Sequence, residues 1–261
     1  MRQELQILYE DPDIIVCFKP HGLATQSHRI STPDLEHMIL NHLAETEHRS
    51  SSHKHRSAPY LAVIHRLDQP VSGILVFAKN PKAARNLNHQ LTNEGFGKHY
   101  MALVDGCPSK ETDTLVNYLV KDSKSNTSRV CDHHTHGAKE ARLSYRIHSK
   151  EAGQTLLEVT LDTGRHHQIR VQLAHMGCPI VGDTKYNPNA QKKGWQEIKL
   201  CAYRLAFHHP AFIYGSTSSS LLYMFTTCWI RSAGSRMLPI ELSWFSVSIR
   251  SARYLLISQL M

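Results

Sequence analysis

The sequence predicts an α+β fold in which a mixed, largely antiparallel sheet is flanked by helices and loops. Short apolar segments of strand type recur along residues 1–210, and few helical segments separate them. Long polar loops join these segments, a pattern typical of α+β domains. Of the 261 residues, 41% are hydrophobic, which is enough to form a substantial core. We see no internal repeat and no linker long enough to separate two domains.

Strands are expected wherever apolar residues run together or alternate between turn residues. The first region, residues 7–18, holds a turn at Asp11-Pro12-Asp13 and the apolar run that follows it. Lys19-Pro20-His21-Gly22 ends this region, because proline and glycine interrupt strands. The remaining strands are expected at Leu61–Ile64, Ile74–Ala78, His99–Val104, Ala141–Ile147, Leu156–Leu161 and Lys199–Phe207.

Helices are expected at three places. Asp34–Leu43 has apolar residues at helical spacing, and Ser31-Thr32-Pro33-Asp34 offers several capping groups. Pro81–Leu91 begins with proline, which the first turn of a helix tolerates. Gln168–Met176 follows the turn Asp162-Thr163-Gly164. Residues 46–58 and 121–138 are polar and are expected to form loops.

Composition excludes several classes of protein. The N-terminus lacks the apolar core of a signal peptide, and the chain lacks the long apolar runs of a multi-span membrane protein. Six scattered cysteines without a Cys-x-x-Cys pair argue against a disulfide framework and a thiolate zinc site, and favour the reducing cytoplasm. A net charge of +8 weakly favours a polyanionic partner.

Residues 211–261 differ in composition from the rest of the chain. They contain 11 serines, four arginines and one acidic residue, with no lysine or histidine. Their apolar stretches show no clean helical or strand period. We therefore expect residues 1–210 to form the functional domain and residues 211–261 to be an atypical, poorly packed segment, from a shifted reading frame or an unrelated fusion. The alternative is a membrane-associating tail, although Leu221–Ile230 is too short to span a bilayer.

Three stretches carry candidate chemistry. Between two apolar strands lie His65, Arg66 and Asp68, and such charges are costly to bury unless they are paired or used. These residues favour either a functional site or a structural ion pair at a strand end.

The second stretch, Leu161–His175, turns at a glycine into a helix whose first turns carry Arg165 and Arg170. A helix N-terminus with added cations attracts anions, although a solvated helix start has the same pattern. Arg170 stands between two apolar residues, so we expect its burial beside a carboxylate. In the third stretch, Tyr100 shares a strand face with Ala102 and Val104, as core tyrosines do.

Together with two further segments, these stretches resemble the RluA-type pseudouridine synthases over roughly residues 8–210. Five motifs match in the family's order: Lys19-Pro20 with Gly22-Leu23; His65-Arg66-Leu67-Asp68 with Ser72-Gly73; Lys98-x-Tyr100-x-Ala102; Thr163-Gly164-Arg165-x-His167-Gln168-Ile169-Arg170; and Gly177-x-Pro179-Ile180-x-Gly182-Asp183-x-x-Tyr186. The resemblance implies the pseudouridine synthase catalytic fold. The first motif starts so close to Met1 that no N-terminal S4 domain is expected.

The resemblance also implies an activity and the residues that perform it. The reaction isomerises uridine in rRNA or tRNA to pseudouridine, with no cofactor or metal. Asp68 matches the catalytic aspartate, Arg170 the arginine that pairs with it, and Tyr100 the tyrosine that packs on the target base. Arg66 matches a residue that fills the gap left by the flipped nucleotide. Lys19, His65 and Arg165 are expected to contact the RNA backbone or to support the catalytic residues.

Some features depart from the pattern or leave alternatives open. Val71 and Gln172 stand where threonine and histidine are usual in the family. The loop histidines His53, His55, His133, His134 and His136 lack zinc-like spacing to acids or thiolates, so we expect them to add charge near RNA and not to bind metal. We expect a monomer without membrane contact. The alternatives are a non-catalytic RNA-binding protein on the same scaffold and a hydrolase using Asp68 and His65, although no nucleophile elbow is visible.

Overall fold

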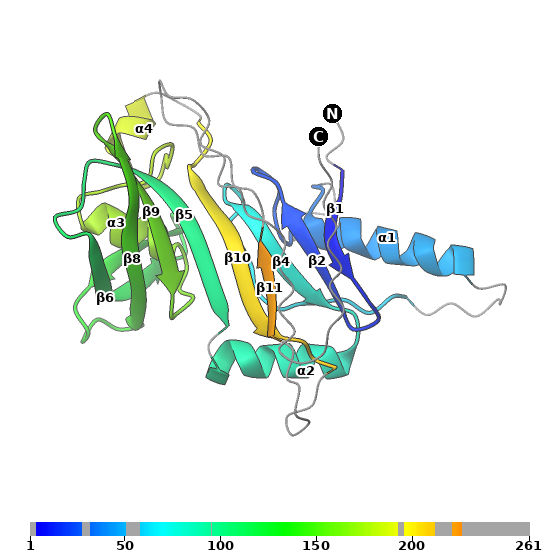
Figure 1. The fold of residues 1–261 in the computed structure, drawn as a ribbon. Coiled ribbons are helices and arrows are strands. Elements are labelled where there is room, and N and C mark those ends of the chain that lie inside the picture. The colour runs from blue at the N-terminus through cyan, green and yellow to red at the C-terminus, as the bar shows by residue number, and fades with distance from the viewer. Residues whose placement is uncertain are drawn as a thin grey trace. The chain divides into compact units, whose positions relative to one another are not determined.

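The computed structural model describes residues 4–27, 32–50, 58–94, 96–192, 196–211 and 221–225 (Figure 1). The chain divides into two compact units. The first unit contains the chain up to Phe96 and resumes at Leu205, and the second contains Gly97–Arg204. Strand β10 (Leu200–His208) therefore contributes its first half to the second unit and its second half to the first.

The first unit contains a sheet of order β1-β2-β4-β10, and β3 pairs with β4 while β11 pairs with β10. The pairs β1–β2, β2–β4 and β3–β4 are antiparallel. The strands of this unit besides β10 are β1 (Gln6–Glu10), β2 (Ile14–Lys19), β3 (Ala62–Val63), β4 (Ser72–Ala78) and β11 (Leu221–Phe225). Five residues of the C-terminal segment thus form a strand, and the rest of that segment beyond residue 211 lies outside the described residues.

Strands β2 and β4 are the central strands of this unit. Nearly every residue of both strands is buried, so both faces of the sheet are covered here. That explains why the sequence shows continuous apolar runs at these strands and not the alternation of a half-exposed sheet.

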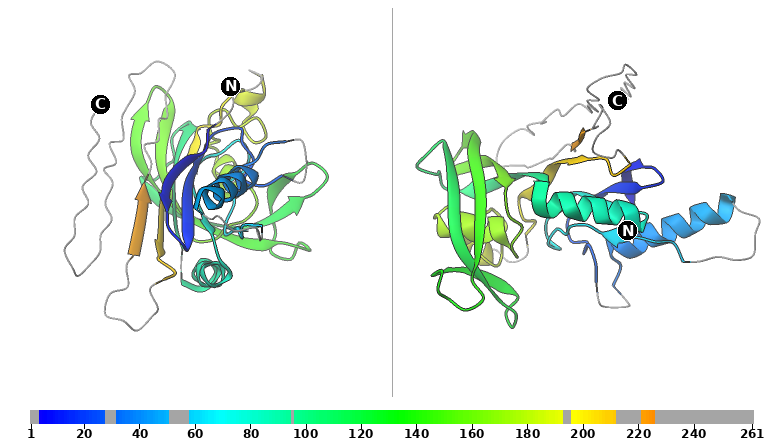
Figure 2. Two further views of the ribbon diagram at one scale, coloured as in Figure 1. Left: turned by 90° about the vertical axis from the view of Figure 1, so that its right-hand side faces the viewer. Right: turned by 90° about the horizontal axis from the view of Figure 1, so that it is seen from below.

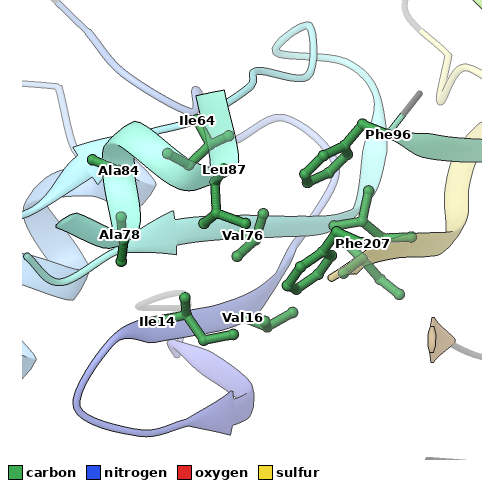
Figure 3. Packing of buried hydrophobic residues seen from close by; sticks show 12 residues of the cluster. Ile14, Val16, Ile64, Val76, Ala78, Ala84, Leu87, Phe96 and Phe207 are labelled. Atoms are coloured by element: carbon green, nitrogen blue, oxygen red, sulfur yellow. The ribbon is translucent and has the colours of Figure 1, made fainter. Parts of the chain in front are cut away.

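Helix α2 (Pro81–His89) covers one face of these strands, and a π-helical turn, η1 (Gln90–Glu94), follows it. The Asn80 side chain caps the helix by accepting a hydrogen bond from the Ala83 amide. Leu87 packs with apolar residues of β2 and β4 in one cluster (Figure 3). Phe96 and Phe207 complete the cluster with stacked rings whose centroids are 5.3 Å apart.

Helix α1 (Leu35–Ser50) is longer than the sequence suggested. The buried carboxylate of Asp34 caps its start by accepting hydrogen bonds from the amides of Ser27 and His37. The polar loop expected at residues 46–58 is wrong for residues 46–50, which are helical, while residues 51–57 lie outside the described part. The polar residues at the end of the helix are compatible with a helical backbone, and the absence of aliphatic side chains was a poor guide.

The second unit contains a sheet of order β10-β5-β9-β8-β6-β7. Its strands besides β10 are β5 (Gly97–Asp105), β6 (Thr112–Asp122), β7 (Thr127–Cys131), β8 (Lys139–Glu151) and β9 (Gln154–Leu161). Helix α3 (Gln168–His175) lies against one face of this sheet, where Val171 packs on Leu119 and Ala141 (Figure 1, Figure 2). The short helix α4 (Pro188–Lys192) was not expected.

The loop expected at residues 121–138 is also wrong in its first half. β6 and β7 form an antiparallel hairpin that pairs Asp122 with Thr127, and β6 pairs with β8 on its other side. Both strands are mostly polar and partly exposed, so the hydrophobic pattern does not mark them. Their strand conformation depends on pairing with β8, which is a tertiary effect.

Among the described residues, no helix is long and apolar enough to cross a membrane.

Candidate active site

The first candidate group is the segment between β3 and β4, which carries His65, Arg66 and Asp68. Asp68 is half-buried, Arg66 is exposed, and Leu67 between them is buried. The Val71 amide donates to the Asp68 carbonyl at 3.0 Å, so the chain turns directly after the aspartate. The side chains of Arg66 and Asp68 are thus presented from a compact turn.

The segment from Lys19 to Thr25 supports this turn from the side. The Lys19 side chain is fully buried, and its ammonium donates to the carbonyls of Leu23 at 2.7 Å and Gln69 at 3.1 Å. The Thr25 hydroxyl donates to the Leu67 carbonyl at 3.0 Å. The backbone on both sides of Asp68 is therefore fixed by hydrogen bonds. These contacts direct the Lys19 ammonium at backbone carbonyls around the Asp68 turn.

Two more contacts tie the same segments together. The Gly22 amide donates to the Gln69 carbonyl at 3.1 Å, and the Gln69 side-chain amide donates to the Gly22 carbonyl at 3.0 Å. The His21 ring donates to the Pro70 carbonyl. A compact group of backbone hydrogen bonds limits how far the Asp68 turn can move.

In the second unit, Tyr100 lies on β5. It is buried on the same face as Ala102 and Val104, as the alternation predicted. Lys98 precedes Tyr100 by two residues and therefore lies on the same face of β5. It pairs with Leu161 at the end of β9. The start of β5 thus presents an aromatic ring and an ammonium side by side.

Helix α3 begins at a turn that side chains hold in place. His167 precedes the helix with a left-handed backbone, at φ 54°. The Gln168 side-chain oxygen accepts from the Thr163 hydroxyl at 2.7 Å and from the Arg165 amide at 2.9 Å. Its amide donates to the Arg142 carbonyl at 3.0 Å. Gln168 therefore fixes the turn 163–165 and leaves the Arg165 side chain exposed.

Arg170 is buried on α3 beside a carboxylate, as its sequence context predicted, and that carboxylate is Asp183. The guanidinium donates two hydrogen bonds to Asp183, at 2.8 Å from Nε and 2.7 Å from Nη2. It also lies over the Tyr186 ring, 5.1 Å from the ring centroid. A bidentate pair with a stacked ring fixes both the position and the plane of the guanidinium.

Tyr186 links this pair to the start of α3. Its hydroxyl is 2.7 Å from Nδ1 of His167 and accepts from the Ser128 amide at 2.8 Å. Burial, followed by the positive charge of Arg170, lowers the pKa of His167 to about 2. The His167 ring is therefore neutral at physiological pH.

Gly182, the residue before Asp183, has a local structural requirement. Its φ is +79°, and a Cβ atom there would clash with the Glu197 carbonyl oxygen.

Gln172, which departs from the family pattern, is buried, and its amide nitrogen lies 2.8 Å from Asn117 Oδ1 and 3.2 Å from two backbone carbonyls. The amide nitrogen of Gln172 thus has acceptors where the family usually has histidine, but its side-chain oxygen is buried without a hydrogen-bond partner among the described residues.

Asp68, Arg66, His65 and Lys19 belong to the first unit, whereas Tyr100, Arg165 and Arg170 belong to the second. The sequence predicts no function for Asp183, Tyr186 or Lys98, although all three lie in the family motifs. Asp183 could have been singled out because it follows Gly182 in its motif. Its pairing with Arg170 could not be predicted, because the two residues are brought together only by the fold.

Among the residues that the structure describes, one group has metal-ligand atoms close together: Asp132, His133 and His134. All three are exposed and consecutive, and the Asp132 carboxylate accepts from the His134 amide at 2.9 Å. His53 and His55 lie outside the described residues.

Curated relatives are about a third identical to this chain over the aligned residues. An uncharacterized RNA pseudouridine synthase of Bacillus subtilis, YlyB, is 31% identical over 79% of this chain and 65% of its own length. Ribosomal large subunit pseudouridine synthase D of Nitrosomonas europaea is 32% identical, over 78% and 56%. Ribosomal large subunit pseudouridine synthase C of Haemophilus influenzae is 32% identical, over 79% and 62%. The chain thus spans less than two thirds of the length of these relatives.

Solved structures have the same fold. Human RNA pseudouridylate synthase domain containing 4 matches with a TM-score of 0.65 and 23% identity, over 85% of this chain and 88% of that one. Human RNA pseudouridylate synthase domain containing 1 matches with a TM-score of 0.64 and 21% identity, over 85% and 83%. These neighbours agree with the α+β fold expected from the sequence. The model of the RNA pseudouridylate synthase family matches residues 13–175, a stretch that includes the Asp68 turn, Tyr100 and Arg170, and the chain belongs to this family.

Proposed function

We propose that this protein isomerises specific uridines of structured RNA, either rRNA or tRNA, to pseudouridine. The observation that carries the proposal is the half-buried Asp68 on a turn fixed from both sides, in a chain of this family. The buried Arg170 and Tyr100 at the positions that the family motifs match give further support.

The reaction breaks one carbon–nitrogen bond and forms one carbon–carbon bond. The bond between uracil N1 and the ribose C1′ breaks, the base rotates, and C5 bonds to C1′. C5 then loses its proton and N1 gains one, so atoms balance without an oxidant or reductant. In this scheme the Asp68 carboxylate displaces uracil N1 from C1′ as a nucleophile, as carboxylates do in retaining glycosidases, and C5 then displaces the carboxylate from C1′ and regenerates it.

The other site residues act around this step. A base in a stacked RNA has to leave the stack before Asp68 reaches its sugar, and the exposed Arg66 fills the space that it leaves. Tyr100 packs on the extruded uracil and assists removal of the C5 proton. Arg170 matches the arginine that acts with the catalytic aspartate in the family. Arg165 contacts the RNA backbone, and His65 and Lys19 hold the Asp68 turn.

The Asp68→Asn variant tests the nucleophile. We expect it to lose pseudouridine formation on unmodified rRNA and tRNA transcripts while it still binds them, because the amide keeps the shape but is a poor nucleophile. Asp113→Asn, at a partly exposed carboxylate paired with Lys110, is the matched control and keeps full activity. Pseudouridine is measured by mass spectrometry of nuclease digests.

Two outcomes would contradict the proposal. Turnover by Asp68→Asn at the wild-type rate would exclude Asp68 as the nucleophile. Binding of RNA by the wild-type protein without any pseudouridine would favour a non-catalytic RNA-binding protein instead.

The target RNA is chosen by surfaces outside the shared motifs, since RNA is recognised largely by its shape and its unpaired bases. In this chain the β6–β7 hairpin and residues 132–138 form one such surface, and we propose that they contribute to the choice of uridine. We also propose that the protein acts as a monomer in the cytoplasm. Mapping pseudouridines in cells with and without the gene identifies the target.

A further inference from the structure

The proposed function assigns no role to Lys98, the first residue of the Lys98-x-Tyr100-x-Ala102 motif. It lies on the buried face of β5, one strand step from Tyr100. Among the described residues, its ammonium makes no hydrogen bond and no ion pair within 4.0 Å. Burial, only partly offset by the charge of Asp162, lowers the pKa of Lys98.

An ammonium in this position costs folding free energy. Removing a charge from water is unfavourable unless a partner of opposite charge replaces the water. Lys98 lacks a close partner, and the nearby positive charge of Arg165 acts in the same unfavourable direction. Such a cost is typical of groups that serve a ligand and not the fold.

Gly164 leaves the ammonium open on one side. A Cβ atom at this glycine would lie 3.5 Å from Lys98 Nζ, which is van der Waals contact. The φ of Gly164 is not in the left-handed region, so the backbone does not require glycine here. Gly164 and Arg165 are both exposed, and Arg165 Nε donates to the Glu140 carbonyl at 2.7 Å, so a ligand reaching this turn from solvent meets a guanidinium that is already held in place.

We infer that Lys98 and Arg165, with Gly164 between them, bind a phosphate group of the RNA beside the uridine that Tyr100 contacts. The inference rests on the proposed function and adds a residue and an anion site to it. A phosphate matches the site because its negative charge pairs with the two cations and because it accepts several hydrogen bonds at once. A side chain at Gly164 would contact the ammonium and shield it on that side.

The test measures RNA affinity as a function of salt. In the Asp68→Asn background, Lys98→Met is compared with the parent on unmodified rRNA and tRNA transcripts. We expect the dissociation constant to rise roughly ten- to a hundredfold, as for loss of one charge-assisted hydrogen bond. The slope of log affinity against log salt falls by about 0.7 to 1, as for loss of one phosphate contact. Lys98→Arg restores most of the affinity.

Two controls separate binding from folding. Lys110→Met, at an exposed lysine outside the site, leaves the slope unchanged. The thermal midpoint of Lys98→Met stays equal to that of the parent or rises, because an unpaired charge is removed.

Gly164→Ala also weakens binding, but adds little in combination with Lys98→Met, since both changes affect one site. If Lys98→Met fails to fold, Lys98→Arg and Gly164→Ala carry the test.

The outcomes distinguish this inference from the proposed function. An unchanged salt slope in Lys98→Met, with RNA binding otherwise intact, overturns the phosphate site alone. A lower thermal midpoint with an unchanged slope shows that Lys98 is structural. If the wild-type chain binds RNA but forms no pseudouridine, the proposed isomerase activity fails, while the slope of the variants still decides whether Lys98 contacts RNA.

Discussion

At the scale of single residues, the pair of Arg170 and Asp183 is the part of the site that the fold protects most. Both side chains are almost fully buried, at 4% and 0% exposed. Removing one partner of a buried pair leaves an uncompensated charge, which costs far more than the pair contributes. The geometry of Arg170 therefore depends on a residue whose carboxylate is expected to touch no substrate.

We predict that Asp183→Ala lowers the free energy of unfolding by about 3–5 kcal/mol, as for a broken buried ion pair. Chemical denaturation measures the loss. The double variant Arg170→Met with Asp183→Leu is expected to recover most of this stability but no pseudouridine formation. Stability equal to wild type in the single variant would show that the pair is not needed to satisfy Arg170.

The sequence predicted the surroundings of some site residues and not of others. Burial of Arg170 beside a carboxylate followed from its apolar neighbours, and burial of Tyr100 followed from strand alternation. The partner Asp183 did not follow, because it lies on a separate loop 13 residues further along the chain. The burial of Lys19 could not be predicted either, because a lysine enclosed by carbonyl oxygens has the same sequence pattern as a solvated one.

At the scale of elements, the start of α2 shows how one side chain serves two structures. The Asn80 oxygen caps the helix by accepting from the Ala83 amide at 2.9 Å, and its amide nitrogen donates to Asp13 Oδ1 at 2.7 Å. Asp13 belongs to the turn between β1 and β2. The cap therefore also joins α2 to the first hairpin.

We predict that Asn80→Ala lowers the free energy of unfolding by about 1–2 kcal/mol, the upper part of the range for N-cap residues. Asn88→Ala, at an exposed position in the same helix, is the control and is neutral or slightly stabilising. Equal effects of the two substitutions would contradict a capping function.

The elements that the sequence predicted well are those whose pattern reflects burial. β2, β4, β9 and α3 were marked by apolar runs or alternation that persists in the folded chain. β6 and β7 were missed because pairing, and not burial, gives them their conformation. The last two turns of helix α1, beyond Leu43, were missed for the same lack of a hydrophobic signal.

At the scale of the whole molecule, several titrating groups change stability in the same direction with pH. The pKa of His167 is about 2, because burial and then Arg170 disfavour its charged form. The unfolded chain binds a proton at this residue below about pH 6.5, whereas the folded chain does not. Burial raises the pKa of Glu158, but hydrogen bonds from Tyr203 and Arg146 outweigh it and lower the pKa overall.

We predict that the free energy of unfolding falls as the pH is lowered from about 6.5, first through His167 and then, below about 4.5, also through Glu158. Asparagine tolerates a left-handed backbone, so His167→Asn tests the first of these groups. We expect the variant to show a flatter dependence of the unfolding free energy on pH between about 6.5 and 4.5, and to keep the steeper fall at lower pH. Urea denaturation at a series of pH values measures it. Identical profiles for variant and wild type would show that His167 binds its proton equally in the folded and unfolded chains.

The split membership of β10 has a consequence for synthesis on the ribosome. The sheet of the first unit runs β1-β2-β4-β10, so β4 lacks its second main neighbour until the second half of β10 has been made. All of the second unit up to Arg204 is translated in between, which takes on the order of 5 to 20 s at usual rates of elongation. During that interval the apolar edge of β4 is open to wrong pairing, and the nascent chain is a natural client for chaperones.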